Sequence, residues 1–87
     1  MVLDSSVAWL LADAAEPCLG DQRTMVFVEL GCGEYHLAVE RILTIVVESR
    51  FALPAAVLDM LTEWLDRYAG SPEEQRLRAL VANIQPA

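Results

Sequence analysis

Hydrophobic residues recur every three or four positions over most of the chain, which is the spacing of amphipathic helices. The first such segment covers residues 6–19, with N-cap candidates at residues 4–6 and Gly20 where a helix C-terminus favours glycine. Pro17 is expected to weaken its last turn. Its apolar stripe consists of Val7, Leu10, Leu11, Ala14, Ala15 and Cys18.

The C-terminal third predicts two more helices in a hairpin. Pro54 suits the first turn of the first of them, and Gly70 ends it. The segment Ser71-Pro72-Glu73-Glu74 is a capping box, with Ser as N-cap and Glu at N3, and Glu74 and Arg78 form a favourable i,i+4 pair. The apolar stripe of the first of these helices consists of Val57, Leu58, Leu61, Trp64, Leu65 and Tyr68. That of the second consists of Leu77, Leu80, Val81 and Ile84.

Residues 24–30 have a different pattern and predict a β-strand. The segment Thr24-Met25-Val26-Phe27-Val28-Glu29-Leu30 is rich in β-branched and aromatic residues, and Gly31-Cys32-Gly33 ends it. Because the chain offers this strand no secure partner, we expect it to pair across a two-fold axis.

Residues 34–50 fit two structures. Polar residues recur every four positions there, at His36, Glu40, Thr44 and Glu48, and this spacing suits one face of a helix or one side of a strand. Length favours a helix, because about 15 residues is too long for a strand in so small a domain. The β-rich segment Ile45-Val46-Val47 leaves a hairpin as the alternative, with residues 31–34 as its turn.

These elements define a single small domain over residues 1–87 that is mainly α. It has about four amphipathic helices and one short strand near residues 24–30, or a β-hairpin. Trp64 shares a stripe with Leu61 and Leu65, so we expect it in the core, whereas Trp9 lies at the edge of its stripe, where both core and interface positions are open. At 55% hydrophobic residues, the chain is more apolar than a small monomer easily buries.

Charge and cysteine content restrict the function. A formal net charge of −7 argues against binding to nucleic acid or an anionic membrane, and no apolar run approaches the roughly 20 residues of a membrane span. With Asp4 where a signal peptide would be basic, we expect a cytoplasmic protein with Cys18 and Cys32 as free, buried thiols. All six basic residues are arginine, which suggests a GC-rich bacterial coding sequence.

One segment is similar to a known cofactor-binding motif. Residues 26–34, with Glu29 before Gly31-Cys32-Gly33, resemble the first motif of class I methyltransferases, which implies a strand leading into a glycine turn around S-adenosylmethionine. The third glycine of that pattern falls at Tyr35, and a methyltransferase domain is longer than 87 residues. A cofactor-binding enzyme fragment is therefore the least favoured function.

The other reactive residues do not form a recognisable site. Cys32 and His36 could supply half of a zinc site with Cys18 as a third ligand, but a fourth strong ligand is missing. His36 is the only histidine, and its closeness to Cys32 in sequence does not create a nucleophile. We therefore assign no catalytic, cofactor-binding or metal residues and expect no cofactor.

The favoured function is a non-enzymatic protein–protein interaction or homodimerisation module, with Trp9, Met25 and Phe27 as interface candidates. The alternative is an acidic regulatory binder, of the antitoxin, immunity-protein or anti-activator type, whose negative surface covers a basic site on another protein.

Overall fold

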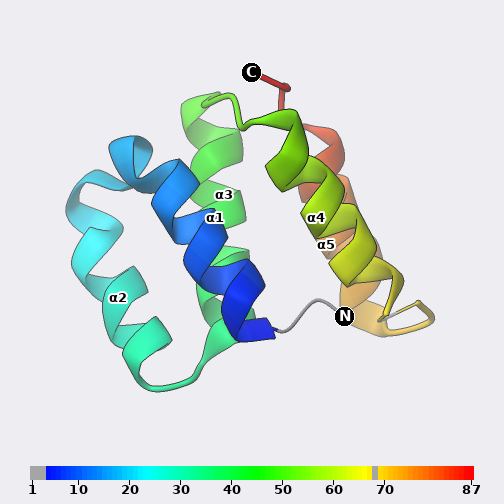
Figure 1. Ribbon diagram of the computed structural model, residues 1–87, viewed down its shortest axis with the longest axis horizontal. Helices are drawn as coiled ribbons and strands as arrows, with labels where there is room; N and C mark the ends of the chain where they lie inside the picture. Colours follow the sequence, from blue (N-terminus) through cyan, green and yellow to red (C-terminus); the bar gives the residue numbers. More distant parts are fainter. Residues whose placement is uncertain (1–3, 68) are drawn as a thin grey trace.

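The computed structural model describes residues 4–67 and 69–87, and helices account for most of them (Figure 1). The predicted mainly helical fold is confirmed, including the helices expected over residues 6–19 and 34–50 and the C-terminal hairpin of helices. Tyr68 lies outside the described residues. The elements are α1 (Asp4–Leu19), a 3-10 turn (Gly20–Gln22), α2 (Arg23–Gly31), α3 (Tyr35–Ser49), α4 (Ala55–Asp66) and α5 (Pro72–Ala82).

The prediction of a strand over residues 24–30 is wrong, because these residues form α2. The expected pairing of this strand across a two-fold axis is therefore wrong as well. Strand propensity reflects packing on a pleated sheet, and the described chain has no sheet: its only β-pairing is an isolated bridge between Leu53 and Pro86. In a helix the backbone of α2 satisfies its own hydrogen bonds, and Val26 and Leu30 reach the core.

Residues 35–49 form a helix throughout, so the hairpin alternative is wrong. The buried residues of α3 follow helical spacing, and Gly33, with φ +77°, terminates the preceding helix instead of turning a hairpin. The Glu34 N–H donates to the Glu29 carbonyl at 2.9 Å, and the Gly33 N–H to that of Leu30 at 3.1 Å. These two bonds form a Schellman motif, whose left-handed residue, here Gly33, is usually a glycine.

The core lies where α1 crosses α3. α1 contacts α3 most extensively, with α2 on one side of this pair and α4 and α5 on the other (Figure 1). Ala8, Ala12 and Ala15 of α1 are completely buried, and such small side chains allow neighbouring helices to approach closely. Pro17 does not end α1 early, since the helix continues to Leu19 before Gly20, with φ +53°, turns the chain.

One polar contact joins three helices. Trp64 of α4 is completely buried, as predicted, and its indole N–H donates to Asp4 Oδ1 of α1 at 2.8 Å. The other oxygen, Asp4 Oδ2, lies 3.6 Å from His36 Nε2 of α3, and the His36 ring lies 5.3 Å from the Trp64 ring. Asp4, an N-cap candidate in the sequence, thus connects α1 to α3 and α4.

The C-terminal segment packs back onto the connection between α3 and α4. The buried Leu53 donates its N–H to the Gln85 carbonyl at 3.1 Å and accepts from the Ala87 N–H at 2.8 Å. Over the residues that the structure describes, no helix has the length and apolarity needed to cross a membrane.

The contact between Trp64 and Asp4 is expected to stabilise the fold measurably. Asp4→Ala leaves the buried indole N–H without this acceptor, whereas Trp64→Phe removes the donor as well. In a double-mutant cycle of urea unfolding, we expect a coupling free energy of about 1–2 kcal/mol. Strictly additive losses would show that the hydrogen bond contributes nothing.

Candidate interaction surfaces

Five large apolar side chains of the described chain are about half exposed, and all belong to α1, α2 and the first turn of α3. Their exposed fractions are 46% for Trp9, 54% for Leu10, 48% for Met25, 54% for Val28 and 53% for Leu37. Single exposed apolar residues are ordinary, but a concentration on neighbouring helices marks an interaction surface.

α2 has apolar side chains on every side, although Arg23, Thr24 and Glu29 lie among them. Met25, Val26, Phe27 and Val28 are consecutive, and successive residues of a helix point about 100° apart. Val26 points into the core, Phe27 packs against Trp9 of α1, and Met25 and Val28 remain exposed. We call Met25 and Val28 the outer face of α2.

The three interface candidates therefore do not share one surface. The rings of Trp9 and Phe27 meet, with centroids 5.9 Å apart and planes inclined at 41°, while Met25 lies on another side of α2. The sequence-based prediction of a strand missed this separation, because alternate residues of a strand, such as Met25 and Phe27, point to the same side.

The flank of α2 that faces α3 is electrically neutral. Arg41 Nε of α3 donates to Glu29 Oε1 at 2.7 Å, and Glu29 is only 12% exposed. The hydrogen bond to Glu29 raises the pKa of the Arg41 guanidinium above its ordinary value. This ion pair leaves the neighbouring outer face of α2 without an unbalanced charge.

A groove of about 450 Å³ lies between α1 and α2, lined by Trp9, Asp13, Glu16, Pro17, Arg23 and Phe27. Within it Arg23 Nε lies 3.3 Å from Glu16 Oε1, and the Arg23 guanidinium carbon lies 5.4 Å from the centre of the Phe27 ring. Asp13 makes no ion pair or side-chain hydrogen bond with residues 4–67 or 69–87. The sequence pattern indicated the aromatic residues of this groove but not its carboxylates.

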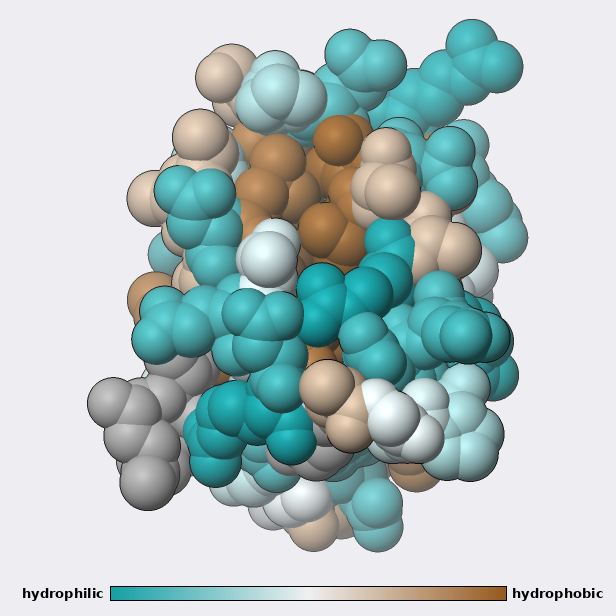
Figure 2. Space-filling view, turned by 90° about the vertical axis from the view of Figure 1, so that its right-hand side faces the viewer, coloured by the Kyte–Doolittle hydropathy of each residue, from teal (hydrophilic) through white to brown (hydrophobic). Residues whose placement is uncertain are grey.

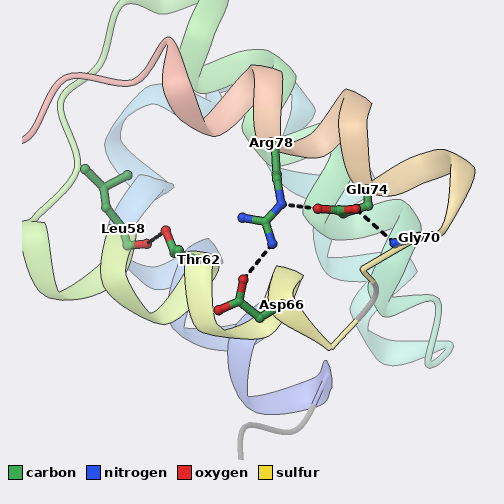
Figure 3. Close-up of polar contacts among 6 residues, drawn as sticks. All are labelled: Leu58, Thr62, Asp66, Gly70, Glu74 and Arg78. Atoms are coloured by element: carbon green, nitrogen blue, oxygen red, sulfur yellow. Dashed lines mark hydrogen bonds and ion pairs between the residues drawn. The ribbon is translucent and has the colours of Figure 1, made fainter.

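A second groove, of about 210 Å³, lies between α4 and α5 and appears as a hollowed apolar patch in Figure 2. Arg78 lines it together with apolar residues such as Leu65 and Val81. Figure 3 shows how Arg78 joins the two helices: its Nη2 donates to Asp66 Oδ1 at 2.6 Å, and its Nε donates to Glu74. The polar edge of this groove is thus paired within the chain.

The predicted i,i+4 pair of Glu74 with Arg78 is confirmed, and Ser71 caps α5 by accepting from the Glu73 N–H. The second half of the capping box differs by one residue, because Glu74 accepts from the Gly70 N–H at 3.1 Å (Figure 3). Arg78 and this backbone N–H stabilise the ionised carboxylate and lower the pKa of Glu74 below its ordinary value.

The reactive residues near the end of α2 are not gathered into one site. Cys32 and Glu34 are exposed, whereas His36 is half-buried beside Asp4 and Trp64. No three His, Cys, Asp or Glu residues in the described ranges are placed to hold a metal ion.

Both cysteines are free thiols, but the expectation that both are buried is wrong: Cys18 is only partly buried, and Cys32 is exposed because it follows the last turn of α2 into the loop. Cys18 is half-buried, and this burial raises the pKa of its thiol, which favours the protonated form.

No known family, curated protein or solved structure matches this chain. Its function is therefore inferred from the surfaces of the molecule itself.

The lowered pKa of Glu74 predicts an acid-dependent loss of stability. A carboxylate with a depressed folded-state pKa stabilises the fold above its unfolded pKa, and this contribution disappears as the pH falls through the folded-state pKa. Glu74→Gln should therefore lower the urea midpoint at pH 7 and have progressively less effect as the pH falls below about 4.

Glu63→Gln is the matched control for this measurement, because Glu63 is exposed on α4 and has no ion-pair partner in the described chain. Identical pH profiles for the two variants would contradict a specific contribution from Glu74.

Proposed function

We propose that this chain is a non-enzymatic interaction module that forms a homodimer through the outer face of α2. The observation that carries the proposal is that α2 has apolar side chains on every side, two of which, Met25 and Val28, remain about half exposed. Large apolar side chains of a helix are ordinarily covered, yet within the described chain only those on the inner sides of α2 are covered.

The position and charge of the outer face support self-association. α2 lies at one edge of the molecule, so a second copy can reach Met25 and Val28 without displacing another helix (Figure 1). A two-fold contact would place these apolar side chains against their own copies, and the Glu29–Arg41 ion pair beside them adds no net charge.

The remainder of the chain opposes close association. Two copies that each carry a net charge of −7 repel one another, and salt screens this repulsion. The homodimer should therefore become tighter as the salt concentration rises. A complex between this chain and a basic partner would instead become weaker as the salt concentration rises, because salt screens the attraction between opposite charges.

A cytoplasmic location also belongs to this proposal. The exposed Cys32 is a free thiol and remains reduced in a reducing compartment, where it does not cross-link copies of the chain.

A second candidate function, binding to a basic regulatory target, is favoured by a different observation. Asp13 has no ion-pair partner among the described residues and lies in an aromatic groove of an acidic chain. This surface is separate from the outer face of α2, so either function can hold without the other.

Sedimentation equilibrium tests the homodimer. We expect the mass to rise above the 9.6 kDa monomer with increasing protein concentration, and Val28→Glu to weaken association by at least about tenfold, because dimerisation would bury a charge in an apolar contact.

Ala56→Glu is the control, since it adds the same charge to an exposed position in the first turn of α4, where a carboxylate suits the helix dipole. A monomer at every concentration and salt level, or equal effects of the two variants, would exclude a dimer through this face.

A further inference from the structure

We propose that the groove between α1 and α2 binds an arginine side chain of a basic protein partner, with the guanidinium held between the Trp9 ring and the Asp13 carboxylate. This proposal rests on the second candidate function and names the chemistry of its partner. It does not depend on dimerisation, because Trp9 and Asp13 lie outside the outer face of α2.

The chain itself already holds one guanidinium in this groove. Arg23 lies over the face of Phe27 at 5.4 Å and beside the Glu16 carboxylate at 3.3 Å. An aromatic face combined with a carboxylate suits arginine, because the planar, weakly hydrated guanidinium can stack and donate hydrogen bonds at the same time.

The same combination recurs further along α1. Trp9 and Asp13 are four residues apart, so they share one face of the helix, and both line the groove. Trp9 contacts Phe27 and remains 46% exposed. No basic side chain in the described part of the chain pairs with Asp13, whereas Glu16 pairs with Arg23.

Charge complementarity favours a basic partner over a second copy of this chain. The chain has a net charge of −7, and four of its six arginines are paired internally with carboxylates. A partner that presents arginine next to apolar residues would satisfy Asp13 and also cover Leu10, which is 54% exposed three residues before Asp13 on α1.

The test uses a short synthetic peptide with the full, isotopically labelled chain. Acetyl-Leu-Arg-Arg-Leu-amide is titrated at low salt while the indole N–H signal of Trp9 and the amide signal of Asp13 are followed by NMR. We expect saturable shifts of both signals, little change at the buried Trp64 indole, and weaker binding as salt is added.

Matched peptides separate the contribution of the positive charge from that of the planar group. Replacing arginine with citrulline keeps the shape but removes the charge, and should weaken binding at least about fivefold. Replacing arginine with lysine keeps the charge but loses the planar group, and should weaken binding about two- to threefold. Citrulline or lysine peptides that bind as tightly as the arginine peptide would overturn the assignment of a guanidinium.

Matched variants locate the site. Asp13→Asn should weaken arginine-peptide binding at least about fivefold, whereas Asp59→Asn removes the same charge from an exposed position on α4 and should have little effect. Equal weakening by the two variants would indicate attraction to the net charge alone and would overturn the site.

Repeating the titration with Val28→Glu distinguishes the two proposals. Binding of the arginine peptide should persist in that variant even though dimerisation is lost. Loss of peptide binding there would instead make the groove dependent on the dimer and contradict an independent site.

Discussion

The fold depends on burying Trp64 completely without leaving its indole N–H unsatisfied. The acceptor is Asp4, sixty positions earlier in the chain, and this carboxylate also approaches His36. One contact therefore joins α1, α3 and α4, and the largest side chain of the core is held at the point where these helices meet. An isolated polar group in this position would oppose burial, whereas the paired indole permits it.

α2 poses the opposite problem, because it has more apolar surface than the chain can cover. Val26 and Leu30 pack inward, Phe27 packs against Trp9, and Met25 and Val28 remain outside. A homodimer would cover the outer side of the helix, and a basic partner would occupy the groove on its α1 side. The two contacts use different side chains and do not compete.

Periodicity predicted most of the helices correctly and failed at α2. In α3 the length of the segment favoured a helix over a strand but left a hairpin as the alternative, and in α5 the segment from Ser71 to Glu74 marked the N-terminus. Residues 24–30 place apolar side chains in every direction, with only Thr24 and Glu29 polar, so neither helical nor alternating spacing is clear, and β-branched composition then suggested a strand. Their helical state reflects the absence of a sheet in the described chain and the space beside α1 and α3.

The sequence by itself determined the helical class, the burial of Trp64, the start of α5 and the acidic charge, because each depends on local spacing or on composition. Tertiary structure alone decided which residues meet: Asp4 with Trp64, Glu29 with Arg41, and Trp9 with Phe27. The placement of Met25 and Phe27 on different sides of one helix also depends on it. Contacts between distant segments follow from how the helices pack around a shared core, and that arrangement is not encoded in the period of any one segment.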